Sequence, residues 1–185
     1  MKTLCIGGAT LAALTFFSTT VWAQVTPAPA QMPAFAQFTA QKQGKIKGEV
    51  LQKGREEQMQ LWGFEWEIVS PRDPASGAAT GRVQHKGVRL LRKVGAGSVQ
   101  LFQALVTNEN FTVVQLSFFG APSKGSGAEA MLQSITLNNA SLASYRQFEQ
   151  PGVGLMEELV LTYQKLTITN PETGVSSATE SSSRV

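Results

Sequence analysis

Hydrophobic and polar residues alternate with a period of two along most of the chain, a pattern that predicts β-strands with one buried face. In chain order, the alternating segments span residues 35–40, 59–69, 83–94, 111–119, 130–148 and 155–168. Glycine-, proline- and asparagine-containing stretches separate several of them, as expected for turns and loops. The sequence therefore predicts a mostly β domain.

One face of segment 59–69 is strongly aromatic. In an extended strand, this face would carry Trp62, Phe64, Trp66 and Ile68. The opposite face would carry Leu61, Gly63, Glu65 and Glu67. Because three large aromatic side chains share one side, we expect that side to form the floor of the core.

The period changes once, in GSVQLFQALVTNE (97–109). Leu101, Phe102, Leu105 and Val106 recur there at the spacing of an amphipathic helix. Ser98 precedes them and is a suitable amino-terminal cap. We therefore expect a single short helix at this point, followed by a return to strands.

Two of the late strands are apolar on both faces. In FTVVQLSFF, the adjacent residues Val113 and Val114 point to opposite sides. In LMEELVLTYQKLTI, one face carries Leu159, Leu161 and Tyr163, and the other carries Val160, Leu166 and Ile168. An open sheet in water usually keeps one face polar. The pattern fits a closed barrel with the helix on its outside, burial against a second subunit, or a β-sandwich covered by the helix.

The two ends of the chain differ from the centre. Residues 1–23 have the positive start, apolar run and small-residue cleavage site of a secretory signal peptide, with an uncleaved anchor as the alternative. Residues 24–33 form a Pro/Ala-rich linker, and residues 34–170 form the folded domain. We expect residues 171–185 to be a flexible Ser/Thr-rich tail, because they have no apolar periodicity.

Composition limits the class of protein. A chain of 185 residues with 42% hydrophobic content suits one compact domain. The formal net charge is only +3 and the basic residues are scattered, which argues against a nucleic-acid partner. The one basic run, VRLLRK (88–93), is interpreted as a strand with one solvated face, with a phosphate-binding stripe as the alternative. No stable membrane insertion is expected.

The sequence offers little reactive chemistry. His85 is the only histidine, and Cys5, the only cysteine, lies in the expected signal segment. A histidine-rich metal site or a thiolate nucleophile in the mature chain is therefore excluded, and no cofactor is expected. Glu157 and Glu158 are adjacent and point to opposite faces, so they do not form a glycosidase pair. We expect no enzymatic activity, with a secreted hydrolase built on His85 as a competing hypothesis.

Four sequence blocks, in this order, carry a resemblance to a known family: FEWEIVSPRDPASGAATGRVQHKGVRL, LFQALVTNE, ITLNNASLASYRQF and EELVLTYQKLTI. They resemble the haemolysin-coregulated protein (Hcp) family, the tube-forming proteins of type VI secretion systems. The resemblance covers residues 35–169, nearly the whole mature domain. Several blocks in the correct order are more specific than one short motif.

The resemblance implies an all-β fold, a β-barrel of two antiparallel sheets with one short α-helix on the side. It implies that copies of the chain form hexameric rings that stack into a hollow tube for effector delivery. The implied partners are the chain itself, effectors in the lumen, and sheath and spike proteins. The resemblance implies no catalytic function.

The segment after the aromatic strand is then expected to be an assembly loop that reaches a neighbouring subunit or ring. Prolines restrict the free loop and so reduce the entropy lost on docking, glycines permit the chain reversal, and charged side chains offer charge-assisted bonds. The expected interface residues are Arg72, Asp73, Pro74, Gly77, Gly81, Gln84, His85 and Lys86. The alternative interpretation is an ordinary surface turn.

The expected signal peptide is unusual for this family, whose tubes are built in the cytoplasm. If the leader is real, the protein is secreted or periplasmic. If Met32 is the functional start, the protein is assembled in the cytoplasm and then secreted. The alternatives in function are an exported monomeric β-sandwich that binds through exposed Trp62, Phe64 or Trp66, and an Hcp-like exported protein outside a secretion machine.

Overall fold

Antiparallel strands make up most of the computed structural model, which describes residues 33–122 and 129–181. The expected signal peptide and almost all of the linker lie outside these ranges. The described strands are β1 (Ala34–Ala40), β2 (Gly44–Ile46), β3 (Met59–Leu61), β4 (Gly63–Glu65), β5 (Ile68–Val69), β6 (Gln84–His85), β7 (Val88–Lys93), β8 (Phe111–Gly120), β9 (Ala130–Gln150), β10 (Gly154–Thr162), β11 (Lys165–Asn170) and β12 (Val175–Glu180). Helix α1 (Ser98–Val106) lies between β7 and β8.

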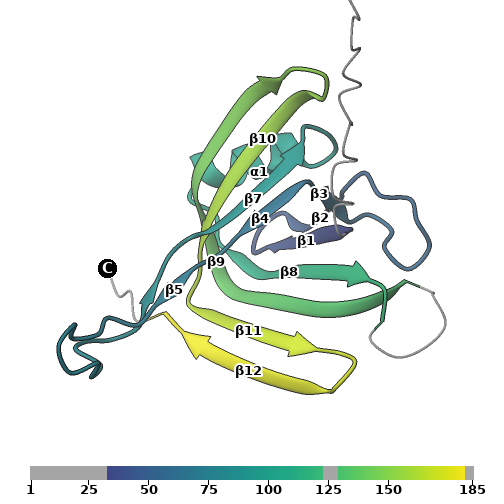
Figure 1. Cartoon of the computed structure of the whole chain (residues 1–185). Coiled ribbons are helices and arrows are strands. Elements are labelled where there is room, and N and C mark those ends of the chain that lie inside the picture. Colours follow the sequence, from purple (N-terminus) through teal and green to yellow (C-terminus); the bar gives the residue numbers. More distant parts are fainter. Residues whose placement is uncertain (1–32, 123–128, 182–185) are drawn as a thin grey trace, which may run out of the picture. The chain divides into compact units, whose positions relative to one another are not determined.

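The long strand β9 belongs to two sheets (Figure 1). Residues 130–140 pair with β8, and residues 134–138 also pair with β11 on the other side. Residues 141–150 pair instead with β10, which leads on to β7 and β4. The predicted all-β architecture of antiparallel sheets with one short helix is therefore confirmed.

The core lies between the two halves of this arrangement. Side chains from both sheets and from α1 are fully buried there, including Phe38, Leu90, Leu101, Leu137 and Leu159. Edge-to-face ring pairs fix part of the packing, as in Phe38 and Phe111, whose ring centroids lie 5.4 Å apart.

The predicted aromatic strand 59–69 is divided into β3, β4 and β5. Strand β3 pairs with β1, whereas β4 pairs with β7 in the other sheet, so the chain changes sheets at Trp62. The phase of the alternation changes with it, and Leu61 rather than Trp62 is buried. Phe64 and Trp66 do pack against the core, as expected. The prediction of one continuous strand was wrong.

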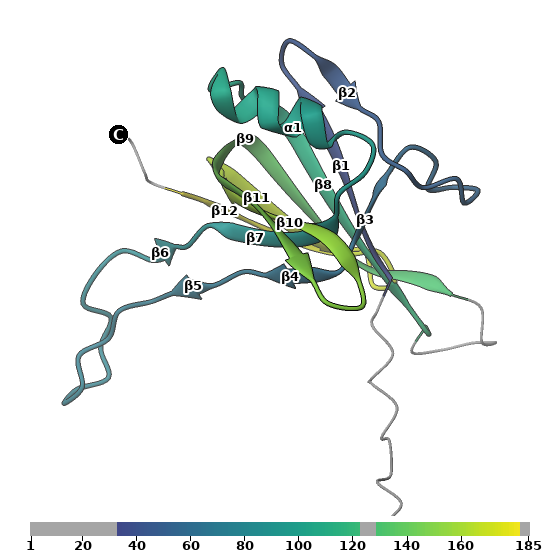
Figure 2. The same cartoon turned by 90° about the horizontal axis from the view of Figure 1, so that it is seen from above.

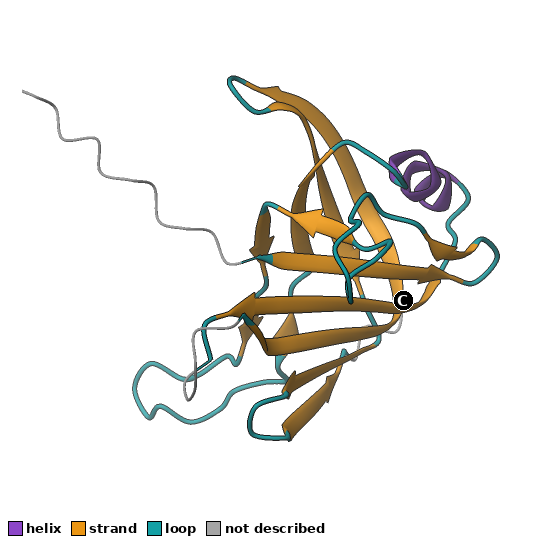
Figure 3. Cartoon of the chain, turned by 90° about the vertical axis from the view of Figure 1, so that its right-hand side faces the viewer, coloured by secondary structure: helices purple, strands orange, loops and turns teal. Residues whose placement is uncertain are grey.

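Helix α1 occupies the predicted segment beside the strands (Figure 3), but its buried face and its cap differ from the prediction. Leu101 and Ala104 face the core, whereas Phe102 remains half exposed and packs on Tyr145 with centroids 5.8 Å apart. The amino-terminal cap is Gly97. Ser98 instead accepts a hydrogen bond from the Gly95 N–H, at 3.0 Å, and closes the preceding turn.

The two apolar faces of the late strands have an explanation within one subunit. Leu159, Leu161 and Tyr163 are buried, and so is Leu166, although simple alternation places it on the other face. The chain passes from β10 to β11 at Tyr163 and Gln164, where the partner changes from the second half of β9 to the first. Both segments therefore turn their apolar residues inward. In β8, Val114 is buried, whereas its neighbour Val113 is exposed.

Strand β7 confirms the predicted strand in VRLLRK but corrects its solvated face. Arg89 and Lys93 are exposed, whereas Arg92 is fully buried. Its Nη1 atom lies 2.9 Å from Oε1 of the fully buried Glu157, which is its direct partner across the β7–β10 ladder. Its Nη2 atom lies 2.8 Å from Glu49 Oε2. The β7–β10 register and these two carboxylates thus compensate the buried charge of the Arg92 guanidinium.

The prediction of a flexible tail was wrong for residues 175–180. Strand β12 pairs with β11 over its whole length. The connecting turn is built by Asn170, whose Oδ1 accepts bonds from the N–H groups of Glu172 and Thr173, and by Gly174 at φ +70°. Backbone pairing holds this strand although its side chains are mostly polar and exposed.

Candidate assembly arm and its root

An exposed arm, defined here as residues 70–83, projects away from the sheets (Figure 2). It begins at β5 and returns at β6, where Ile68 pairs with His85 and Val69 pairs with Gln84. No residue between 70 and 84 is buried. The expected interface segment is therefore accessible over its whole length in the single chain.

The tip of the arm is a small folded turn. Arg72 and Ala79 form an isolated antiparallel bridge. The Asp73 N–H donates to the Ala78 carbonyl and the Gly77 N–H donates to the Asp73 carbonyl, each at 2.8 Å. Gly77 has φ +69°, a conformation that glycine adopts without strain. The tip is thus preorganised, which lowers the entropy lost on docking.

The two charged residues at the tip take part in this turn. Asp73 Oδ1 accepts hydrogen bonds from the N–H groups of Ala75 and Ser76 and from the Ser76 hydroxyl, at 2.7–3.0 Å. These bonds favour the ionised form and lower the pKa of the Asp73 carboxyl. The Arg72 guanidinium donates to the Gly77 carbonyl at 3.1 Å. Both side chains therefore shape the tip within the single subunit.

A hydrogen-bonded group, which we call the root cluster, holds the base of the arm. It consists of Trp66, His85, Tyr163 and Thr179. The Trp66 indole N–H donates to the Tyr163 hydroxyl at 2.9 Å. His85 Nδ1 lies 3.0 Å from the same hydroxyl, and His85 Nε2 lies 3.3 Å from the Thr179 hydroxyl. Burial raises the pKa of Tyr163, so it remains a neutral donor and acceptor near neutral pH.

The structure separates the predicted interface residues into two groups. Arg72, Asp73, Pro74 and Gly77 lie in the tip, with Gly81 on the returning limb. Gln84, His85 and Lys86 lie at the root. Lys86 forms an exposed ion pair with Glu67 at 2.7 Å, which is worth little in water. Tyr163 and Thr179 are members of the root that the sequence analysis missed, because the fold brings them there from distant strands.

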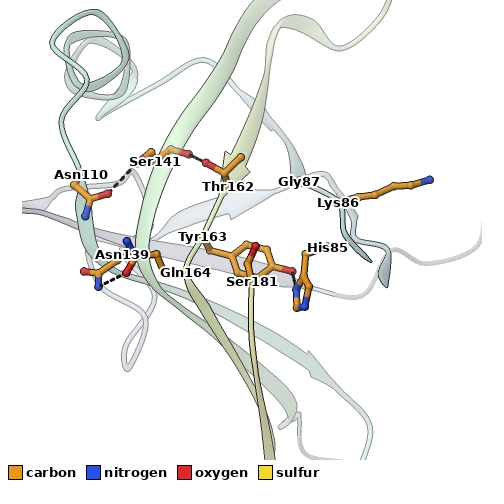
Figure 4. Close-up of a pocket in the computed structure, with 10 residues that line it drawn as sticks. All are labelled: His85, Lys86, Gly87, Asn110, Asn139, Ser141, Thr162, Tyr163, Gln164 and Ser181. Carbon is orange, nitrogen blue, oxygen red and sulfur yellow. Dashed lines mark hydrogen bonds between the residues drawn. The ribbon is translucent and has the colours of Figure 1, made fainter. Parts of the chain in front are cut away.

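A pocket of about 260 Å³ lies beside the root cluster (Figure 4). Its lining includes His85 and several amide and hydroxyl side chains, among them Asn139, Ser141 and Gln164. The two serines in this lining are Ser141 and Ser181. The His85 nitrogens face Tyr163 and Thr179 rather than either serine. Among the described residues, His85 is therefore not arranged as the base of a serine nucleophile.

The described residues also bear on a metal site, a membrane-spanning helix and a binding surface. Within residues 33–122 and 129–181, no group of three or more His, Cys, Asp and Glu side chains is arranged to hold a metal ion. In the same ranges, no helix is long and apolar enough to cross a membrane. The aromatic rings expected at the surface of a binding module are engaged instead. Phe64 packs edge-to-face on Phe118, and the Lys93 ammonium lies 4.4 Å from the Trp62 ring.

Known proteins give a consistent assignment. Residues 38–169 match the family model described as "Type VI secretion system effector, Hcp". The Major exported protein of Pseudomonas aeruginosa is 29% identical over 160 residues, which cover 78% of this chain and 92% of that one.

Solved structures show the same fold. The Hcp1 protein of E. coli EAEC 042 has a TM-score of 0.72 at 19% identity, covering 81% of this chain and 99% of its own. The secreted protein Hcp3 of Pseudomonas aeruginosa has a TM-score of 0.67 at 23% identity, covering 81% and 98%. Because the family model matches more than two-thirds of the sequence, this chain belongs to the Hcp family of type VI secretion proteins.

Proposed function

We propose that this chain forms homohexameric rings that stack into a hollow tube for effector delivery, with the arm reaching a neighbouring copy. Membership of the Hcp family makes it a structural secretion protein rather than an enzyme, with self-assembly and type VI secretion partners in general. Family membership alone does not establish the hexamer, the tube or an effector in its lumen, and these are what we propose.

The arm is the observation that carries the proposal. A segment of 14 residues, 70–83, has no buried side chain, yet its tip is held by backbone and side-chain bonds. A loop that had only to connect β5 and β6 would need neither this length nor an ordered tip. An ordered projection with no buried residue suits docking to another surface. A ring needs such head-to-tail contacts between unlike flanks.

Size-exclusion chromatography with light scattering tests the ring directly. We expect the mature protein at micromolar concentration to have six times the subunit mass, and negative-stain images to show rings with a central hole. A protein that remains monomeric at millimolar concentration would contradict the proposal. It would favour the exported monomer or an Hcp-like protein outside a secretion machine.

The route of export remains a separate prediction, because residues 1–32 lie outside the described ranges. If the leader is cleaved before Gln24, the protein is periplasmic or secreted through general export and does not feed a tube built in the cytoplasm, so export and tube assembly are alternatives. Intact-mass measurement of the protein from its native host tests this. A start at Gln24 supports export of the subunit, whereas a start at Met32 supports assembly in the cytoplasm.

A further inference from the structure

The arm has few means of keeping a fixed direction relative to the barrel. Strands β5 and β6 share only two residue pairs, next to which the Lys86 N–H donates to the Glu67 carbonyl at 3.1 Å. An isolated two-stranded hairpin is marginally stable in water. The ion pair between Lys86 and Glu67 is exposed and contributes little. Segments with few buried contacts open locally at low free-energy cost. The direction of the arm therefore depends on the side chains at its base.

The root cluster supplies that attachment from both limbs of the arm. Trp66 lies just before β5 and His85 lies in β6, so one residue flanks each end of the arm, and both reach the hydroxyl of Tyr163. Tyr163 is only 6% exposed and belongs to the core. Its ring also lies edge-on to His85, with centroids 5.7 Å apart. One core residue thus fixes the spacing and the exit of both limbs.

The hydrogen bonds of the cluster can be satisfied together in either tautomer of His85. In one of them, Tyr163 accepts from the Trp66 N–H and donates its own proton to His85 Nδ1. A neutral His85 then carries its proton on Nε2 and donates to the Thr179 hydroxyl. The chain of bonds therefore runs from the arm through the core to β12. Thr179 is half-buried, unlike most residues of its strand.

We propose that Tyr163 and Thr179 are positioning residues that hold the arm at a fixed angle and join it to the β11–β12 hairpin as one unit. This inference rests on the proposed function, because a fixed arm matters only if the arm docks. In that case the β11–β12 hairpin affects assembly through the arm: loosening the hairpin would lower the fraction of arms that point correctly and weaken stacking accordingly.

Hydrogen–deuterium exchange of the arm tests the attachment. The chain has only two tyrosines, which gives a matched pair of variants. Tyr163→Phe removes the hydroxyl shared by Trp66 and His85, and we expect backbone exchange in residues 67–86 to accelerate about tenfold, in line with the loss of two hydrogen bonds. Tyr145→Phe removes the bond to Glu157 Oε2, at 2.7 Å, in another part of the fold. It is expected to lower global stability and leave arm exchange unchanged.

A second pair covers the case in which Tyr163→Phe fails to fold. Thr179→Val keeps the side-chain shape and removes the hydroxyl that faces His85. We expect arm exchange to rise up to about fivefold, although residue 179 lies 94 positions from His85. Ser177→Ala, at an exposed position of the same strand, is the control and should have no effect on the arm.

Two outcomes would overturn the inference. One is an unchanged arm in both Tyr163→Phe and Thr179→Val. The other is equal acceleration in Tyr145→Phe, which would show that the arm only follows global stability. Light scattering of the unmutated protein tests the hexamer separately, so a failure of the proposed assembly is distinguishable from a failure of this inference.

Discussion

Arg92 and Glu157 form a buried ion pair between strands β7 and β10. Both side chains are fully buried, and Glu157 also accepts the Tyr145 hydroxyl at 2.7 Å. Nothing in the VRLLRK pattern indicates this, because basic residues in a strand are usually solvated. The pair results from the register of β7 and β10, which places Arg92 opposite Glu157 and which a local sequence pattern does not contain. A buried ion pair is costly to break, whereas replacing it as a whole is much cheaper.

We therefore expect a large difference between single and double substitutions. Glu157→Leu alone leaves the buried Arg92 guanidinium with only Glu49, which is partly exposed, as a carboxylate partner, and should lower the free energy of unfolding by about 3 kcal/mol. Arg92→Met combined with Glu157→Leu should cost clearly less than the single change. Denaturant unfolding of the three proteins measures both values. If the double variant is less stable than Glu157→Leu, the pair is not the coupled unit inferred here.

At the scale of elements, the sequence predicted which segments are strands better than where strands change partners. Alternation correctly indicated β1, β7, β8, β9 and β10, and the single change of period indicated α1. The division at Trp62 and the passage from β10 to β11 were missed, since a change of sheet shifts the phase without any turn residue that marks it. Strand β12 was missed because backbone pairing, not an apolar face, holds it.

The same limitation applies to the candidate site. The proline and glycine pattern of residues 70–83 was enough to predict an exposed, shaped loop. The root cluster could not be predicted, because Tyr163 and Thr179 are distant in sequence from the arm. Moreover, Thr179 lay in a segment that had no apolar periodicity. Long-range contacts of this kind depend on sheet topology, which a local pattern does not contain.

The bend of β9 is the element on which the two-sheet arrangement depends. Asn139 has φ +49° at the place where β9 leaves β8 and β11 and joins β10, and its amide donates to Gln164 Oε1 at 3.2 Å. Asparagine and glycine tolerate this left-handed conformation, whereas β-branched residues do not.

Substitutions at this position should therefore differ in a defined order. We expect Asn139→Val to lower the free energy of unfolding by about 2 kcal/mol. Asn139→Gly should cost less than half of this, because it loses only one exposed hydrogen bond. Thermal unfolding followed by circular dichroism measures the order. Equal losses in the two variants would show that the side-chain bond, rather than the backbone conformation, matters at the bend.

At the scale of the whole molecule, the arm lies outside the hydrophobic core. The barrel core involves no residue between 70 and 83, so changes at the tip should leave the subunit folded. The charged residues of the tip nevertheless contribute to its shape. Arg72 bonds to Gly77, and Asp73 closes the turn through Ser76. Their removal is expected to act by disordering the tip as well as by removing bonds to a neighbour.

We expect Arg72→Ala combined with Asp73→Ala to leave the melting temperature of the subunit nearly unchanged. The stacking of rings should weaken by about tenfold or more, because two charge-assisted bonds are lost and the tip is less ordered. Lys53→Ala combined with Glu56→Ala is the matched control. It removes the same charges from another exposed loop, where Glu56 also accepts a turn N–H, from Gly54, at 2.8 Å. Tube lengths in electron micrographs measure the effect. A length distribution equal to that of the unmutated protein would mean that rings stack through another surface, whereas shortened tubes in both variants would indicate a general effect of charge.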